Sequence, residues 1–242
     1  MIESALQKFA LMGASWVLYL LLAMSIFSIG IICERTMYFR SHSGDVDSLG
    51  NELLRFLKAG DVASAEALLR ASKTIEAAIL LPALAWLDGG ADSVSEALES
   101  STVKKRGELE RGLTSLGTLG NNAPFVGLFG TVIGVIQAFH MLGASGAGAN
   151  QGAMGNVIVA ISDALIATGV GLIVALPAVV GYNLAQKKVS SIENNVSVIS
   201  KQILALLKAD PKLLAQFSEL SEPVAEEDAG AMVAGEEQPE LS

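Results

Sequence analysis

One carboxylate, that of Asp163, lies within a long apolar stretch of this sequence. The stretch runs from Val157 to Tyr182 and is long enough to cross a bilayer as a helix. Between Gly112 and Gln186, Asp163 is the only residue among Asp, Glu, Lys and Arg, although the chain has 16 basic and 25 acidic residues. A charged side chain at membrane depth costs about 2.5 to 3.5 kcal/mol on the mildest scales, so such residues usually mark an ion path. The position of Asp163 therefore predicts a role in moving an ion.

The chemistry open to Asp163 is proton exchange, because a carboxyl group whose access to water changes can take up and release a proton. An intramembrane aspartyl protease needs two carboxylates that share a proton, and this segment has only one. The alternative is a structural Asp163 that bonds to a hydroxyl on a neighbouring helix. A polar residue that cannot ionise would serve that purpose at lower cost, so we favour the ion path.

Other kinds of site have little support in the sequence. A single cysteine, Cys33, excludes an internal disulfide and a cysteine-based metal cluster. Two histidines, His42 and His140, are too few and too far apart to predict a metal site, and His140 fits an interfacial residue better than a proton relay. The glycine-rich stretches lack the GK[ST] of a phosphate loop, and the net charge of -9 gives no reason to expect nucleic acid. We expect neither a metal nor a cofactor, and no enzyme activity.

The elements that position Asp163 are three candidate transmembrane helices. Hydrophobic residues make up 51% of the chain and the mean hydropathy is +0.50. Apolar residues concentrate in residues 14–33, 113–142 and 157–182, each close to the length that spans a bilayer. The fold class predicted is therefore an all-α integral membrane protein with three transmembrane helices and long helices that extend into the cytoplasm.

The basic residues predict the orientation of these spans. Only Lys8 precedes the first span, whereas ten Lys and Arg residues lie between the first and second spans and five follow the third. By the positive-inside rule the N-terminus is periplasmic, and residues 34–112 and the C-terminus are cytoplasmic. The predicted location is the inner membrane, with the lipid bilayer as a partner. An amphipathic lead, residues 1–13, and a loop of small residues, 143–156, then lie on the periplasmic side.

The cytoplasmic parts are expected to be mainly helical. Within residues 34–112, helical spacing predicts a first helix through Leu49, Leu53, Leu54 and Leu57, and a second through Ala63, Ala67, Leu68 and Ala71. Ser93 and Glu96 have the spacing of a capping box, and no proline follows before Pro124. This pattern predicts one long helix that runs unbroken into the second span.

After the third span, residues 183–209 read as a cytoplasmic helix that continues from the membrane. Residues 210–242 are rich in acidic residues and contain no basic residue after Lys212, so they predict a disordered, solvating tail. A basic binding partner for this tail is the alternative.

Small residues in the second and third spans predict close helix packing. Gly130 and Gly134 form a GxxxG pair, and Ala160, Ala164 and Gly171 lie on one stripe of the third span. Pro177 is expected to loosen this span near its inner end. Thr168 lies about 140° from Asp163 around an ideal helix, so the two need not share a wall within one chain.

Two segments resemble the signature regions of a known family. APFVGLFGTVIGVIQAF (123–139) and DALIATGVGLIVALPAVVGYN (163–183) are similar to the membrane segments of the MotA/TolQ/ExbB proton-channel family, and closest to its ExbB and TolQ branch. The order of spans and loops is also similar, as is AGDVASAEALL (59–69).

The resemblance implies a motor stator. Such subunits assemble as a homopentamer around the transmembrane helices of two copies of an ExbD/TolR-like protein, and proton flow drives a periplasmic or outer-membrane process, in some cases through a TonB-like or TolA-like protein. By motif, Thr131 and Thr168 correspond to polar residues that line the pore. Asp163 stands where ExbB-like sequences usually have Glu, a departure that bears on the pore geometry and on the ion.

Two alternatives stay open at this point. Asp163 and two threonines are a credible set of oxygen ligands for sodium, so a sodium-driven stator of the same family is one. A non-conducting membrane scaffold with a structural Asp163 is the other. The sequence does not distinguish import, envelope maintenance and motility as the process that is energised.

Overall fold

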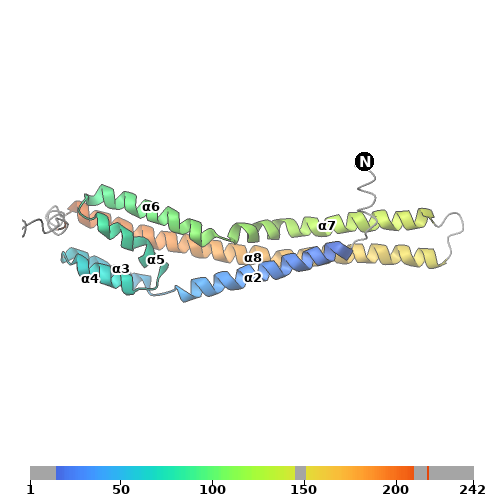
Figure 1. Cartoon of the computed structure of the whole chain (residues 1–242), viewed down its shortest axis with the longest axis horizontal. Coiled ribbons are helices and arrows are strands. Elements are labelled where there is room, and N and C mark those ends of the chain that lie inside the picture. Colours follow the sequence, from blue (N-terminus) through green and yellow to red (C-terminus); the bar gives the residue numbers. More distant parts are fainter. Residues whose placement is uncertain (1–14, 145–150, 210–216, 218–242) are drawn as a thin grey trace, which may run out of the picture. The chain divides into compact units, whose positions relative to one another are not determined.

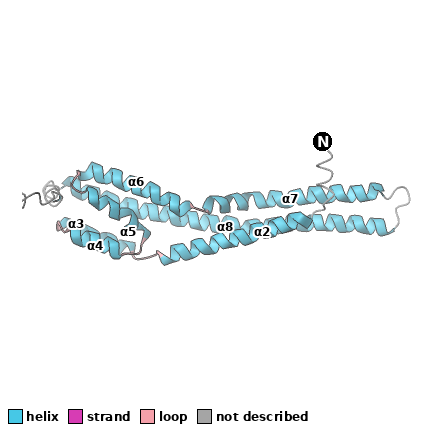
Figure 2. Ribbon diagram, viewed as in Figure 1, coloured by secondary structure: helices cyan, strands magenta, loops and turns pink. Residues whose placement is uncertain are grey.

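Every regular element that the structure describes is a helix (Figures 1 and 2). The structure is a computed structural model that describes residues 15–144, 151–209 and 217. Its elements are α2 (Ser15–Ser41), α3 (Val46–Lys58), α4 (Val62–Ala71), α5 (Ile75–Leu80), the 3₁₀ helix η1 (Leu81–Trp86), α6 (Gly90–Glu110), α7 (Leu113–Ala144) and α8 (Gln151–Ala209). They form two compact units, residues 1–42 with 106–191 and residues 43–105 with 192–242, and α6 and α8 contribute to both.

Three of these helices are long and apolar enough to cross a membrane: α2, α7 and the Met154–Ala209 part of α8. Within the most apolar window of each, only 22 to 28% of the residues are buried. Most of their apolar side chains are therefore open to surroundings outside the chain, as a bilayer or neighbouring subunits would provide. The predicted all-α class with three candidate spans is confirmed.

In the first unit, α2, α7 and α8 pack along one another (Figure 1). Their main cluster of buried side chains takes two residues from each helix: Val17 and Leu21, Ala123 and Ile133, and Val174 and Ala175. Trp16 of α2 also meets Phe129 of α7 edge to face, with ring centroids 6.2 Å apart. A second cluster joins Ile31, Leu116 and Ala178. The three candidate spans therefore form one helical unit.

The second unit is built from short capped helices. The Asp45 carboxylate accepts a hydrogen bond from the Ser48 N–H at the start of α3, and Asp61 does the same with Ser64 at the start of α4. Hydrogen bonds from Ser64 to the Asp61 side chain lower the pKa of that carboxyl group below its ordinary value. Gly50 of α3 lies against Ile199 of α8, where an added Cβ atom would come within 3.1 Å.

The apolar face predicted for the second short helix is wrong. In α4 the buried residues are Ala65 and Leu69, whereas Ala63 and Ala67 are exposed. Alanine carries too little apolar surface to determine which face is buried, and the larger Leu69 sets it instead.

The long unbroken helix predicted from Ser93 into the second span is also wrong. The helix is interrupted between α6 and α7. Gly112 there adopts a left-handed φ of 80°, which glycine alone adopts readily. Ser93 is not a cap, because α6 begins earlier and the Ser93 hydroxyl donates to the Gly89 carbonyl. Pro124 lies inside α7 without ending it.

Helix ends also differ from the expected ranges. The first span continues as helix to Ser41, α7 reaches Ala144, and α8 begins at Gln151. The expected loop 143–156 is therefore largely helical at both ends, and its residues 145–150 lie outside the described residues. Residues 1–13 lie outside them too, as do residues 210–242 except Phe217, which is buried.

Candidate functional site

The Asp163 side chain lies on α8 at the edge of the face that packs against α7. Ala160 and Ala164, on the same turns of α8, are buried, whereas Asp163 is exposed. Among the described residues, its carboxylate has no hydrogen-bond or ion-pair partner within the chain. Within the described residues, this carboxylate therefore takes no part in the packing of the helices.

Glycines bring the backbones of α7 and α8 together next to Asp163. A Cβ atom on Gly134 would lie 2.5 Å from the Ala164 Cβ and 3.1 Å from the Ala160 carbonyl oxygen. A Cβ atom on Gly130 would lie 2.9 Å from the Ala167 Cβ. Side-chain atoms essentially never approach so closely, so a larger residue at either glycine would push the helices apart. The carboxylate thus projects from the closely packed helix pair.

Further along the same pair, Gly127 and Gly171 lie opposite each other. A Cβ atom on Gly127 would be 3.2 Å from the Gly171 Cα, and one on Gly171 would be 2.8 Å from the Ala123 carbonyl oxygen. Pro177 is exposed, and α8 stays helical through it.

The two threonines lie on the opposite edge of the contact from Asp163. The Thr168 hydroxyl of α8 donates to the Gly127 carbonyl of α7 at 3.1 Å, which links the two helices. Thr131 lies one turn after Gly127 on the same face of α7, and its hydroxyl donates to the Leu128 carbonyl at 2.6 Å. Because Thr168 and Asp163 are about 140° apart on α8, one chain does not bring the three side chains together.

The remaining candidate residues add no metal site. The described residues contain no group of three or more His, Cys, Asp and Glu side chains that could hold a metal ion. His140 is exposed near the end of α7, Cys33 is exposed on α2, and the His42 ring bonds to the Tyr38 carbonyl.

Two buried charged residues were not singled out from the sequence. Arg35 at the end of the first span is 7% exposed, and Glu76 of α5 is 4% exposed, with its carboxylate accepting from the Asn195 amide at 3.0 Å. Arg35 follows the first span next to Glu34, where an arginine is ordinarily solvated, whereas Glu76 lies in the apolar run Ile75–Trp86, whose composition was a signal for burial.

These features define an all-helical, multi-pass membrane protein in which Asp163 is the one carboxylate within the apolar stretches 14–33, 113–142 and 157–182. The comparisons agree with this class: the family described as the MotA/TolQ/ExbB proton channel family matches residues 71–197, more than half of the chain. The chain belongs to this family, whose members are channels and not enzymes. It is accordingly a multi-pass membrane protein of the inner-membrane ExbB and TolQ family.

Similar proteins carry both branch names. The Biopolymer transport protein ExbB of Xanthomonas campestris is 40% identical over 99 residues, which cover 41% of this chain and 38% of that protein. The Tol-Pal system protein TolQ of Pseudomonas aeruginosa is 38% identical over 96 residues, 40% of each chain. The Biopolymer transport protein ExbB of Pseudomonas putida is 35% identical over 123 residues, 51% of this chain and 36% of that protein. The matches thus span well under two thirds of these relatives.

Proposed function

We propose that this chain is a pore-forming stator subunit of an inner-membrane motor driven by the proton-motive force. The observation that supports this most is Asp163, an exposed carboxylate within a candidate span that has no partner among the described residues of its own chain. Its desolvation would be costly in lipid, so the carboxylate is expected to face water or another protein chain.

In this proposal Asp163 and the threonines Thr131 and Thr168 line an ion path only when several copies assemble. A homopentamer with an ExbD/TolR-like partner, in two copies, would place the Asp163 edge of one subunit near the threonine edge of the next. Exposed apolar side chains on all three candidate spans, such as Phe125 and Leu165, support assembly with neighbours. The output would be a periplasmic or outer-membrane process, through a TonB-like or TolA-like protein.

Ion flow supplies enough energy for such work. Moving one elementary charge through 100 mV releases about 2.3 kcal/mol, so a few protons can drive a conformational cycle. In the proposed orientation the N-terminus is periplasmic and residues 34–112 and the C-terminus are cytoplasmic.

The test is proton flux into liposomes that contain this protein and its partner. Asp163→Asn keeps the size of the side chain and removes its charge, so flux should fall to the background of empty liposomes while the complex still assembles. Ser162→Asn is the matched control, because Ser162 is the exposed neighbour of Asp163 on α8. It should leave flux close to that of the wild type, because it leaves the carboxylate in place.

The same measurement separates the alternatives. A non-conducting scaffold with a structural Asp163 predicts equal responses from Asp163→Asn and wild type at equal assembly. A sodium-driven stator predicts that ion flux and output depend on external sodium. They should then persist without a pH difference across the membrane. Either result would contradict the proton-driven proposal.

A further inference from the structure

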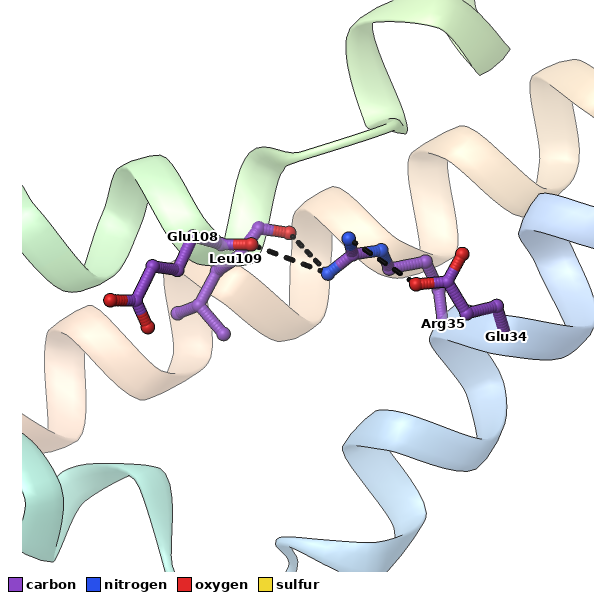
Figure 3. A network of polar contacts seen from close by, with 4 residues as sticks. All are labelled: Glu34, Arg35, Glu108 and Leu109. Carbon is purple, nitrogen blue, oxygen red and sulfur yellow. Dashed lines mark hydrogen bonds and ion pairs between the residues drawn. The ribbon is translucent and has the colours of Figure 1, made fainter.

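The break between α6 and α7 is held by a buried arginine from another helix. α6 ends at Glu110, Gly112 turns the chain with its positive φ, and α7 begins at Leu113. The last four carbonyl groups of an α-helix have no partner within the helix and need donors from elsewhere. At the end of α6 these donors come from Arg35 of α2 (Figure 3).

Arg35 reaches two of these carbonyl oxygens with one nitrogen. Its Nη1 atom donates to the Glu108 carbonyl at 3.3 Å and to the Leu109 carbonyl at 3.4 Å. A positive charge at the C-terminus of a helix is also favoured by the helix dipole. The guanidinium group therefore caps α6 both by hydrogen bonding and by charge.

The Arg35 side chain is buried and contacts several neighbouring groups. Its side chain is 9% exposed, and the Glu34 carboxylate lies 3.7 Å from Nη2 as its charge partner (Figure 3). The Tyr38 ring lies 5.8 Å from the guanidinium carbon. The buried Nε atom has no hydrogen-bond partner among the described residues. Burying a charge is costly unless it is paired and hydrogen-bonded, so the Glu108 and Leu109 carbonyl groups and the Glu34 carboxylate are what stabilise the arginine at this place.

The end of α6 is attached to α8 as well. Glu110 accepts hydrogen bonds from Arg106 of α6 at 2.9 Å and from Gln186 of α8 at 3.4 Å. A Cβ atom on Gly112 would lie 3.6 Å from Ile31 and 4.0 Å from the Arg35 Nε, which are ordinary contacts. Gly112 is thus needed for its φ angle and not for space.

We propose that Arg35 is a positioning residue that fixes the α6–α7 break, and that it thereby couples the end of the first candidate span to the entry into the second. The coupling follows from the contacts alone. Only its consequence for motor output rests on the proposed function.

The test is hydrogen exchange of the full chain in lipid nanodiscs, read at the hydrogen-bonded amides on either side of the break, residues 106–110 of α6 and 116–118 of α7. Arg35→Met keeps the apolar stem and removes the charged donors, so these amides should exchange about tenfold faster, the effect of losing a hydrogen bond from a charged group. Arg40→Met, an exposed arginine of the same helix, is the control and should exchange like wild type. Arg35→Lys, which keeps the charge with fewer donors, should restore part of the protection.

Equal exchange in Arg35→Met and Arg40→Met would overturn the proposal. If Arg35→Met does not insert, Arg35→Lys and Gly112→Ala decide, because both should speed exchange at the same amides. The amides of residues 116–118 are the first in α7 with a backbone acceptor, beginning with the Leu116 N–H bonded to the Gly112 carbonyl, and their lack of protection in the wild type would also overturn the proposal. Proton flux is a separate readout: Asp163-dependent flux should persist in Arg35→Met, and its absence from the wild type would contradict the proposed function without touching the exchange result.

Discussion

At the scale of single residues, Thr168 can be tested as an interhelical link. Its hydroxyl donates to a carbonyl of α7, whereas the Thr131 hydroxyl donates within its own helix. Thr168→Val keeps the shape and removes the bond, so it should lower the unfolding free energy of the solubilised protein by about 0.6 kcal/mol, the average for such bonds between membrane helices. Thr168→Ser should keep wild-type stability.

Thr131→Val is the control for this measurement. Because its bond does not join two helices, its effect on resistance to unfolding by detergent should be smaller than that of Thr168→Val. Equal losses from the two variants would show that the Thr168 bond contributes nothing to helix association.

Residue type was enough to single out Asp163, since an isolated carboxylate in an apolar segment has few explanations. Residue type did not indicate Arg35, because an arginine after a span is ordinarily a solvated orientation signal. Its burial depends on the end of α6, more than 70 residues further along the chain. What the Asp163 carboxylate contacts in a working complex depends on other chains and stays a prediction.

At the scale of helices, the close contact of α7 and α8 predicts that the effect of a Gly→Ala substitution on stability depends strongly on its position. Gly134→Ala would place a Cβ atom 2.5 Å from that of Ala164, so the helices must separate or shift. Forcing extra atoms into a packed contact costs about 1 to 3 kcal/mol. Gly169→Ala of α8 is the control, because nothing lies within 4 Å of its added Cβ atom.

Unfolding of the solubilised protein, followed by circular dichroism, should show a loss for Gly134→Ala only. Gly169→Ala should be neutral or slightly stabilising, since alanine favours helix over glycine. A neutral Gly134→Ala would mean that α7 and α8 are not held as closely as these contacts require.

The helices themselves were largely predictable, and their ends were not. Apolar runs identify α2 and α7 because length and composition decide a candidate span. The break at Gly112 was missed because glycine is common in this region and its left-handed φ depends on the partners at the end of α6. The alanine-rich α4 gave the wrong buried face for a different reason, because alanine carries too little apolar surface to determine it.

At the scale of the whole chain, the dominant feature is apolar surface left exposed on the candidate spans. Tyr19, Phe139 and Ile173, one from each span, are 74%, 69% and 69% exposed. A soluble monomer rarely exposes so many large apolar side chains, so lipid or other chains must cover them. Composition predicted the membrane class. The structure of one chain does not show which part of this surface contacts lipid and which contacts protein.

The orientation of the spans is the last prediction, and two exposed positions test it in a Cys33→Ser background. Ala59 follows α3, and Gly143 lies near the end of α7 with nothing within 4 Å of an added Cβ atom. The distribution of Lys and Arg predicts that Gly143→Cys reacts with a membrane-impermeant thiol reagent added outside the inner membrane. Ala59→Cys should react only after that membrane is permeabilised, because residues 34–112 carry ten of the sixteen basic residues. The reverse pattern would place those basic residues outside and contradict the orientation, whereas labelling of neither position before permeabilisation would contradict a crossing between them.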